Sequence, residues 1–281
     1  MINLNGQLLA PDNASLPITN RGFAYGDAVF ETIRVINGKI IFWEDHYFRL
    51  MASMRIMRME IPLDFSPEFL EREILDLVEA NDLQNNAARV RLNVFRREGG
   101  YYTPETNDIG YSISAEALSS PFYLLSDGNY EVELFKDHYL SSGLLSTLKT
   151  NNKALNVLGS IFARENSYQN CLLLNENKNV VEALNGNLFL VKDKVVKTPP
   201  LSEGCLKGIT RGKIIEILKQ LKEYTLVEEP ISPFELQKAD ELFITNVIVG
   251  IQPISKYRKK EFDNAVAKDL LAKLNVKVRL G

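Results

Sequence analysis

Cysteine and histidine are scarce in this chain of 281 residues. It has 2 cysteines, Cys171 and Cys205, and 2 histidines, His46 and His138. Two distant cysteines make neither a disulfide framework nor a zinc ligand pair. Two distant histidines leave little material for a metal site or a histidine-based catalytic triad. We therefore expect no bound metal, a reducing cytoplasmic setting, and acid-base chemistry by lysine, carboxylates, tyrosine or a bound cofactor.

An excess of one charge and long apolar runs are also missing. The chain has 33 Lys+Arg and 36 Asp+Glu, a net charge of -3, so no polybasic surface for nucleic acid or anionic membrane is evident. The segment Met1 to Gly6 lacks the features of a signal peptide, and no stretch approaches the roughly 18 apolar residues of a membrane span. We expect neither nucleic acid nor membrane as a partner.

The first part of the chain predicts a hairpin, helices and a strand. Strand-like runs at 30–36 and 39–42 are joined by Asn37-Gly38, which both tolerate the positive φ of a tight hairpin turn. Apolar spacing predicts a helix over 44–59, and Ser66-Pro67 caps and opens another. Alternation over 89–95 places Val90, Leu92 and Val94 on one face and Arg89, Arg91 and Asn93 on the other, as in a half-buried antiparallel strand.

Irregular segments suggest two domains. The turn-rich stretch from Gly99 to Gly110 is a candidate functional loop. The stretch 119–129 is interpreted as a linker between a small α+β domain, 1–118, and a larger domain, 130–281. The larger domain shows strand-like runs at 131–135, 171–175, 188–191, 195–198 and 241–245, and helices around 153–167, 210–221 and 262–274. Such short strands predict a mixed or antiparallel sheet.

Two helix starts in the larger domain could carry chemistry. Gly208-Ile209-Thr210 leads into an apolar-periodic helix, with Thr210 as its N-cap or first-turn residue; this predicts either a phosphate site or simply a capped helix. Lys153 stands at the start of another helix, where the macrodipole favours a neutral amine, as a Schiff-base lysine needs. A solvated lysine is the alternative, and Lys149 is a nearby competitor. No Walker-type or GxGxxG motif supports an ATP or dinucleotide site.

Three further side chains can each be interpreted in two ways. Glu182, flanked by apolar strand residues, is either a solvated hairpin edge or a partner for a buried cation. Arg49 is either a surface arginine or a phosphate anchor. His46 lies three residues earlier on the same helical face, and is interpreted as a packing or supporting residue rather than a metal ligand.

Further motifs occur in chain order at 21–34, 44–50, 153–156, 182–189, 208–211 and 239–246. Taken together, they resemble the class IV, fold-type IV pyridoxal-phosphate enzymes. That family includes branched-chain and D-amino-acid aminotransferases and 4-amino-4-deoxychorismate lyase. The resemblance implies an α+β chain with a small N-terminal α+β domain, a larger C-terminal α/β domain with a pseudo-barrel of strands, pyridoxal 5'-phosphate as cofactor, and a homodimer.

The resemblance also implies roles for individual residues. Lys153 is similar to the lysine that binds the cofactor as a Schiff base and then moves the proton. Glu182 is similar to the carboxylate that pairs with the pyridine nitrogen. The implied phosphate contacts are Arg49, Gly208, Ile209, Thr210 and a further loop at Asn246 and Val247. In that loop the aminotransferases usually have a small residue followed by threonine, so Asn-Val is more like the lyase.

The reaction is left open between two members of the family. The segment from Lys153 to Gly159 and the intact Gly208 to Arg211 resemble aminotransferases, whereas Asn246 and the segment from Arg96 to Tyr102 resemble the lyase. We favour amino-group transfer between an amino acid and a 2-oxo acid. The alternative is the lyase, which releases pyruvate and 4-aminobenzoate from aminodeoxychorismate. A non-catalytic binding protein on the same fold is the alternative from another class.

The substrate site is the least specified part. The tyrosine-x-arginine carboxylate pair of branched-chain aminotransferases is absent from its expected place, where Asn93-Val94-Phe95 stand. We expect Arg96 or Arg97, together with Arg34, to supply charge to the substrate carboxylate, and Phe30 to line the substrate site. For Arg96 and Arg97 a solvated strand end is the alternative.

Overall fold

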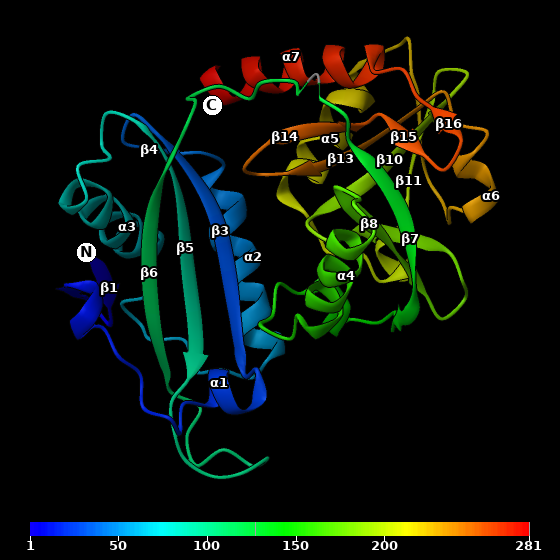
Figure 1. Ribbon diagram of the computed structural model, residues 1–281. Coiled ribbons are helices and arrows are strands. Elements are labelled where there is room, and N and C mark those ends of the chain that lie inside the picture. Colours follow the sequence, from blue (N-terminus) through cyan, green and yellow to red (C-terminus); the bar gives the residue numbers. More distant parts are fainter. Residues whose placement is uncertain (127, 281) are drawn as a thin grey trace. The chain divides into compact units, whose positions relative to one another are not determined.

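The computed structural model describes residues 1–126 and 128–280, without the side chain of Leu280, and they form two compact units (Figure 1). The first unit contains 1–121 and 149–152, and the second contains the described parts of 122–148 and 153–280. The chain thus leaves the first unit, returns for four residues and leaves again just before Lys153. Asp127, in the predicted linker, and Gly281 lie outside the described residues. No helix within the described ranges is long and apolar enough to cross a membrane.

The first unit is built on a six-stranded antiparallel sheet with the order β2-β1-β6-β5-β3-β4. Its strands are β1 (Ile2–Leu4), β2 (Gln7–Leu9), β3 (Ala28–Ile36), β4 (Lys39–Ile40), β5 (Ala87–Arg96) and β6 (Ile109–Leu118). Its helices are η1 (Pro11–Asn13), α1 (Arg21–Tyr25), α2 (Trp43–Ile56) and α3 (Pro67–Ala80).

The predicted hairpin is confirmed, because β3 and β4 pair across Asn37 and Gly38, whose φ angles are +48° and +72°. The second strand is shorter than predicted, since Phe42 adopts φ +56° as the N-cap of α2. That helix in turn ends at Ile56 rather than at 59, because Arg58 has φ +55°. The predicted start of α3 is confirmed: the Ser66 side chain accepts a hydrogen bond from the amide of Phe69.

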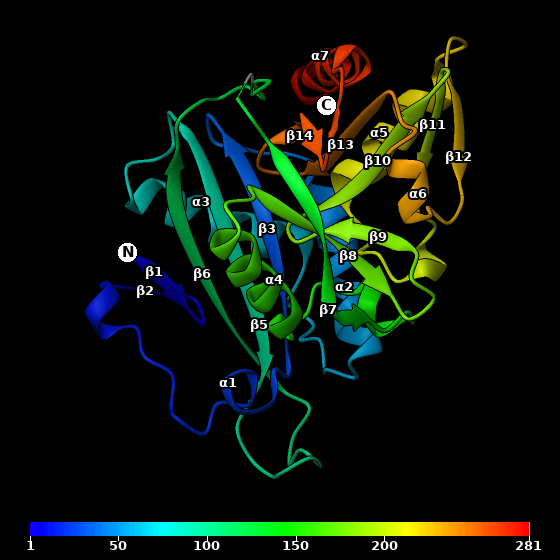
Figure 2. The same ribbon diagram turned by 45° about the vertical axis from the view of Figure 1, so that its right-hand side comes forward.

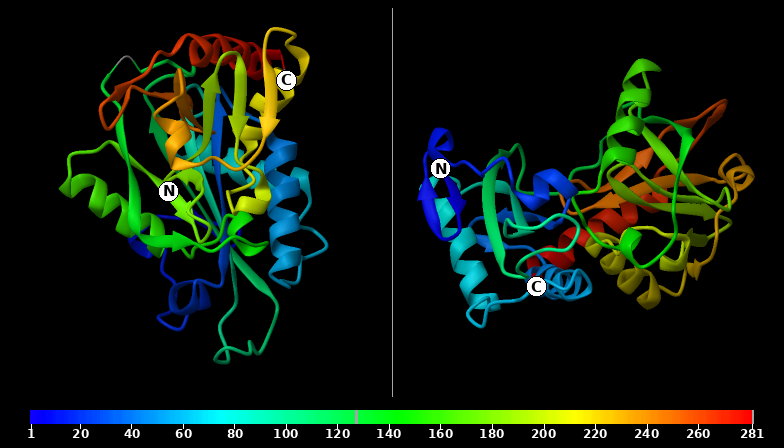
Figure 3. Two further views of the ribbon diagram at one scale, coloured as in Figure 1. Left: turned by 90° about the vertical axis from the view of Figure 1, so that its right-hand side faces the viewer. Right: turned by 90° about the horizontal axis from the view of Figure 1, so that it is seen from below.

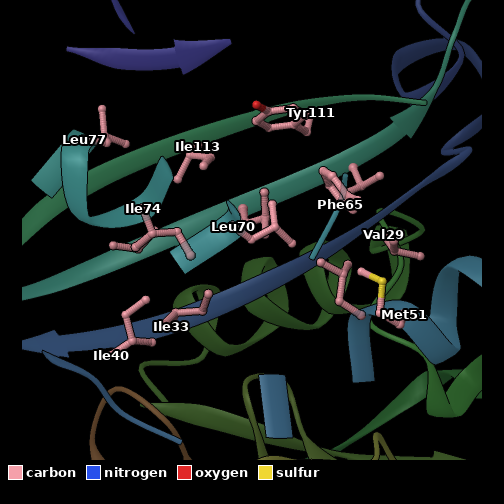
Figure 4. Packing of buried hydrophobic residues seen from close by; sticks show 14 of the residues in the cluster. Val29, Ile33, Ile40, Met51, Phe65, Leu70, Ile74, Leu77, Tyr111 and Ile113 are labelled. Atoms are coloured by element: carbon pink, nitrogen blue, oxygen red, sulfur yellow. The ribbon is translucent and has the colours of Figure 1, made fainter. Parts of the chain in front are cut away.

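The core of the first unit lies between one face of the sheet and the two long helices. Ile33 of β3 lies near Leu70 and Ile74 of α3, and Val29 lies near Met51 of α2 (Figure 4). The alternation predicted for β5 is also confirmed, since Val90, Leu92 and Val94 are buried in this cluster. The opposite sheet face therefore carries the polar members of β5 and the even-numbered residues of β3.

The second unit is built on a mixed sheet of ten strands, as its short strands predict. The order is β12-β11-β10-β9-β8-β7-β15-β16, and β13 pairs with both β10 and β14. Its strands are β7 (Glu131–Leu140), β8 (Asn170–Asn175), β9 (Val180–Ala183), β10 (Gly186–Lys192), β11 (Val195–Thr198), β12 (Thr225–Glu228), β13 (Glu241–Asn246), β14 (Gly250–Ile254), β15 (Lys256–Tyr257) and β16 (Lys260–Glu261).

The helices of the second unit pack against different strands of this sheet. In Figure 2, α4 lies along β7 and β8, while α5 and α7 pack against each other near β13 and β14, an arrangement that Figure 3 shows from two further directions. The helices are η2 (Leu145–Thr147), α4 (Ala154–Glu165), η3 (Leu201–Glu203), α5 (Ile209–Gln220), α6 (Pro233–Leu236) and α7 (Ala265–Leu280).

Strand β10 holds the centre of the second unit, because it pairs with β9, β11 and β13. Its register places Asn187 opposite Glu182 of β9 and also opposite Thr245 of β13. The backbone of Asn187 is therefore held from both sides, and the side chains around it are positioned by three strands rather than by a loop.

Candidate active site

Lys153 is the N-cap residue of α4, so the predicted helix start is confirmed. Burial lowers the pKa of its amine, and the negative charge of Glu182 only partly offsets this effect. Because burial disfavours the charged ammonium, the neutral amine is easier to reach than in water. A neutral amine is the nucleophile that a carbonyl requires.

Glu182 lies on β9 and is only 8% exposed, so the solvated hairpin edge is a wrong interpretation. Its Oε2 accepts a hydrogen bond of 2.9 Å from the amide of Leu206 and lies 3.4 Å from the donating Nδ2 of Asn187. These donors satisfy the buried carboxylate. It is therefore suited to pair with a protonated ring nitrogen.

The start of α5 has the properties of an anion site. Gly208 is the N-cap and contributes no capping side chain, and Thr210 lies in the first turn, as one of the two predicted placements has it. The hydroxyl of Thr210 is buried and has no hydrogen-bond partner among the described residues. A buried hydroxyl without a partner is unusual in proteins. Together with the positive end of the helix, it fits a phosphate group.

Lys153, Glu182 and the start of α5 fit pyridoxal phosphate. All three belong to the second unit. Lys153 would hold the carbonyl carbon, Glu182 the ring nitrogen, and Ile209 with Thr210 the phosphate. The fit rests on the orphaned hydroxyl of Thr210, because a simple helix cap would leave no polar group unsatisfied.

Arg49 belongs to the first unit, where it is buried on α2. Its Nε donates to Oε1 of Glu31 at 2.8 Å and its Nη2 donates to Oε2 at 2.5 Å. Nδ1 of His46 forms a hydrogen bond of 2.6 Å with the same Oε2. A solvated surface arginine is therefore the wrong interpretation, and the supporting role of His46 is confirmed. The contact of Arg49 with phosphate stays a prediction.

Comparison with known proteins agrees with this geometry. The family model described as "Amino-transferase class IV" matches residues 28–257. The chain belongs to this family. A relative in Methanocaldococcus jannaschii, provisionally named a branched-chain-amino-acid aminotransferase, is 31% identical over 278 residues, 99% of this chain and 95% of that protein. The D-alanine aminotransferase of Listeria monocytogenes serotype 1/2a (strain 10403S) is 30% identical over 261 residues, 90% of this chain and 86% of that protein.

A solved structure extends the likeness to the fold. A branched-chain amino acid aminotransferase from the organism abbreviated T.th., complexed with N-(5'-phosphopyridoxyl)-L-glutamate, superposes with a TM-score of 0.86 at 25% identity, covering 98% of this chain and 92% of that chain. The predicted family, fold type, enzymatic activity and cofactor are thereby confirmed: the protein is a pyridoxal-phosphate-dependent class IV aminotransferase.

Asn246, the last residue of β13 in the aminotransferase, forms side-chain hydrogen bonds with backbone groups of the same chain. Oδ1 of Asn246 accepts hydrogen bonds of 3.0 Å from the amides of Ile248 and Val249, and its Nδ2 donates to the carbonyl of Asn185 at 3.1 Å. The carbonyl of Val247 accepts from the hydroxyl of Tyr123. The phosphate contacts predicted for Asn246 and Val247 stay predictions.

Arg96 of the aminotransferase is buried, so a solvated strand end is wrong for this residue. Its Nε donates to Asp27 at 2.9 Å. Its other donors reach the carbonyls of Met57 and Arg58 and Oδ1 of Asn107. These contacts account for its charge within the first unit, and its contact with a substrate stays a prediction.

The other predicted substrate residues differ in exposure. Arg97 is exposed, and its Nε donates to the carbonyl of Ile109 at 3.1 Å, as a solvated strand end would. Arg34 is buried on β3 and donates to the carbonyl of Ser120. Phe30 is buried on the same sheet face of the aminotransferase as Arg34, the polar one.

Two cations lie over the ring of Phe30, a contact that the sequence analysis did not predict. The guanidinium carbon of Arg91 lies 4.0 Å from the ring centroid of Phe30, and Nζ of Lys149 lies 4.6 Å from it. Burial and the nearby charge of Arg89 lower the pKa of Arg91. The alternation of β5 placed Arg91 on the polar face and could have indicated it. No local signal indicates Lys149, because it reaches β3 only in the folded chain.

Lys153→Ala is expected to abolish covalent binding of the cofactor, because the amine that attacks the carbonyl is removed. Purified protein should be incubated with pyridoxal phosphate, reduced with borohydride and digested, and the adduct located by mass spectrometry. We expect it on the peptide that contains Lys153. Lys149→Ala is the matched control and should keep the adduct. An adduct on Lys149 would contradict the assignment.

Glu31→Gln is expected to destabilise the aminotransferase at neutral pH by about 3 to 5 kcal/mol, since it leaves the charge of Arg49 buried without its carboxylate. Burial alone would raise the pKa of Glu31, but the charge of Arg49 and the hydrogen bond from His46 outweigh it and lower the pKa from 4.5 to about 2. A depressed carboxylate pKa stabilises the fold above about pH 4.5, and this stabilisation is lost as the pH falls toward 2.

Urea unfolding of both proteins at a series of pH values checks this expectation. The difference in the free energy of unfolding should be constant near neutral pH and shrink below about pH 4.5. A difference that is the same at pH values above and below about 4.5 would show that the Glu31 carboxylate is not the stabilising group.

Proposed function

We propose that Lys153 is the residue that moves the proton in amino-group transfer between an amino acid and a 2-oxo acid. The observation that supports this is the desolvated amine of Lys153 near a buried carboxylate, in the same unit as an uncapped helix start. When bound, pyridoxal phosphate supplies a carbonyl for the substrate nitrogen and a ring that accepts electrons. Once released by the substrate, the amine of Lys153 would take the proton from Cα and pass it on without returning it to Cα, because amino-group transfer turns Cα into the carbonyl carbon of a 2-oxo acid.

Glu182 and the start of α5 have complementary tasks in this proposal. The Glu182 carboxylate keeps a proton on the ring nitrogen, which strengthens the ring as an electron acceptor. The amides of Ile209 and Thr210 and the Thr210 hydroxyl bind the phosphate, which orients the ring toward Lys153. Neither task requires a histidine, in agreement with the scarcity of that residue.

We further propose that Arg91, beside Phe30 within the first unit, binds a carboxylate. A guanidinium forms two parallel hydrogen bonds with a carboxylate, and partial burial makes such a pair stronger than in water. The apolar ring of Phe30 beside it offers a surface for the substrate side chain. Branched-chain amino acids and D-alanine, named for the two relatives described above, are the first substrates to test.

The reaction is tested by incubating the holoenzyme with a panel of L- and D-amino acids plus 2-oxoglutarate, and separately with aminodeoxychorismate. We expect a 2-oxo acid product that forms only when the acceptor is present. Release of pyruvate and 4-aminobenzoate from aminodeoxychorismate without any acceptor would instead identify the lyase and overturn the proposed transfer.

Arg91→Met on the same panel tests the carboxylate contact. Loss of a charge-assisted hydrogen bond should raise KM by about 10- to 100-fold, with a smaller change in kcat. Arg89→Met is the matched control, because Arg89 pairs with the exposed Glu116 and its side chain is 43% exposed. Equal KM values for the two variants would remove Arg91 from the substrate site.

The homodimer is a further part of the proposal, and helix α4 supports it. Ala154, Val157, Leu158 and Ile161 are exposed and recur at helical spacing, so they form one apolar stripe. A contiguous exposed apolar stripe is typical of an interface. We propose that the stripe packs against a second copy of the chain.

Val157→Asp should convert the dimer to a monomer, since a charge in an apolar interface is unfavourable. The molar mass measured by light scattering after size-exclusion chromatography tests this. Val276→Asp on α7 is the matched control, because Val276 is 55% exposed and Val157 is 57% exposed. A monomeric wild-type protein, or an unchanged mass for Val157→Asp, would refute the proposed interface.

A further inference from the structure

Asn187 is a buried polar residue that the proposed function does not use. It is 3% exposed and lies on β10, where it pairs with Glu182 of β9 and with Thr245 of β13. Because the strands on both sides hold its backbone, its side chain has a fixed direction. A buried amide in such a place needs hydrogen-bond partners, and its partners define what it does.

The amide nitrogen of Asn187 joins two parts of the candidate active site. Nδ2 donates to the carbonyl of Leu206 at 2.8 Å and lies 3.4 Å from Oε2 of Glu182. The amide of Leu206 donates to the same Oε2 at 2.9 Å. The peptide that precedes α5 is thereby tied to the carboxylate, once directly and once through Asn187.

The side-chain oxygen Oδ1 of Asn187 lies close to Gly208, the N-cap residue of α5. A Cβ added to Gly208 would come within 2.0 Å of Oδ1 of Asn187, which no side chain tolerates. Gly208 has φ -70°, a conformation that any residue adopts. Its lack of a side chain is therefore explained by the close approach of Asn187 and not by the backbone conformation. The amide of Gly208 also donates to the carbonyl of Leu206, the acceptor of Asn187.

We infer that Asn187 is a positioning residue that holds the Glu182 carboxylate and the start of α5 in one fixed arrangement. The inference rests on the proposed function, in which Glu182 contacts the ring nitrogen and α5 the phosphate. Since both groups bind one rigid cofactor, an error in their relative position weakens binding at both ends. Asn187 itself touches neither the reacting atoms nor the substrate in this assignment.

The test uses Asn187→Asp, which keeps the shape of the side chain but replaces the donor with a second carboxylate. Two neighbouring carboxylates raise the pKa of one of them, so Glu182 holds the ring proton less well. We expect the dissociation constant of pyridoxal phosphate to rise at least roughly tenfold, as for loss of a hydrogen bond to a charged group. The 15N chemical shift of labelled cofactor should also move toward the unprotonated value.

Asn175→Asp is the matched control for damage to the fold. Asn175 is also fully buried, and its Nδ2 donates to a carboxylate, Oε2 of Glu203 at 2.7 Å, and to a carbonyl of the same residue. This variant should lose thermal stability while the dissociation constant and the 15N shift stay at wild-type values. Equal cofactor properties for the Asn175 and Asn187 variants would overturn the inference.

A double-mutant cycle tests the contact with Gly208. Gly208→Ala should weaken cofactor binding at least roughly tenfold in the wild-type background and much less in Asn187→Ala, because removing Oδ1 makes room for the added methyl group. Additive effects would overturn the inference. Failure of the cofactor assignment on which the inference rests is distinguishable, because the wild-type protein would then form no covalent adduct on Lys153, whereas failure of this inference leaves that adduct in place.

Discussion

The burial of one carboxylate, Glu182, is the constraint on which the candidate active site depends. An ionised carboxylate inside a protein is unfavourable unless donors surround it. The donors here include the amide of Leu206 and the side chain of Asn187. Those two groups belong to the segment that begins α5 and to the strand that pairs with β9, so satisfying the carboxylate also brings together the elements of the candidate cofactor site.

The same constraint recurs in the first unit with a different solution. Glu31 of β3 is buried beneath α2 and is neutralised by Arg49, with His46 completing its hydrogen bonds. There the partner is a full positive charge, whereas the amides of Leu206 and Asn187 are neutral donors to Glu182. Neutral donors hold a carboxylate in place without cancelling its charge, which suits the role proposed for Glu182.

Local features of the fold were predictable because they depend on few neighbouring residues. The turn at Asn37 and Gly38, the Ser66-Pro67 cap and the alternation of β5 follow from backbone conformation and side-chain period alone. Strand β6 was not predicted, because its C-terminal half carries exposed residues and lacks a continuous apolar face. The end of α2 was placed too late, because the left-handed conformation of Arg58 leaves no strong local signal.

The candidate site was predicted less completely, and the reason is physical. Lys153 and Thr210 were identifiable because a helix start has its own local chemistry. The burial of Glu182 and the pairing of Arg49 with Glu31 were not, because burial depends on which strands and helices pack together. The contact between Lys149 and Phe30 was not predictable either, because the two residues are far apart in the sequence and meet only in the folded chain.

The sequence by itself determined the family, the cofactor and the lysine at the start of α4. It did so because the motifs, taken in chain order, resemble those of the class IV enzymes. Only the tertiary structure decided that Glu182 is buried, that Asn187 contacts both Glu182 and Leu206, and that Gly208 has no room for a side chain. Such contacts arise where three strands and a helix start meet, and no local pattern along the chain encodes a distance between them.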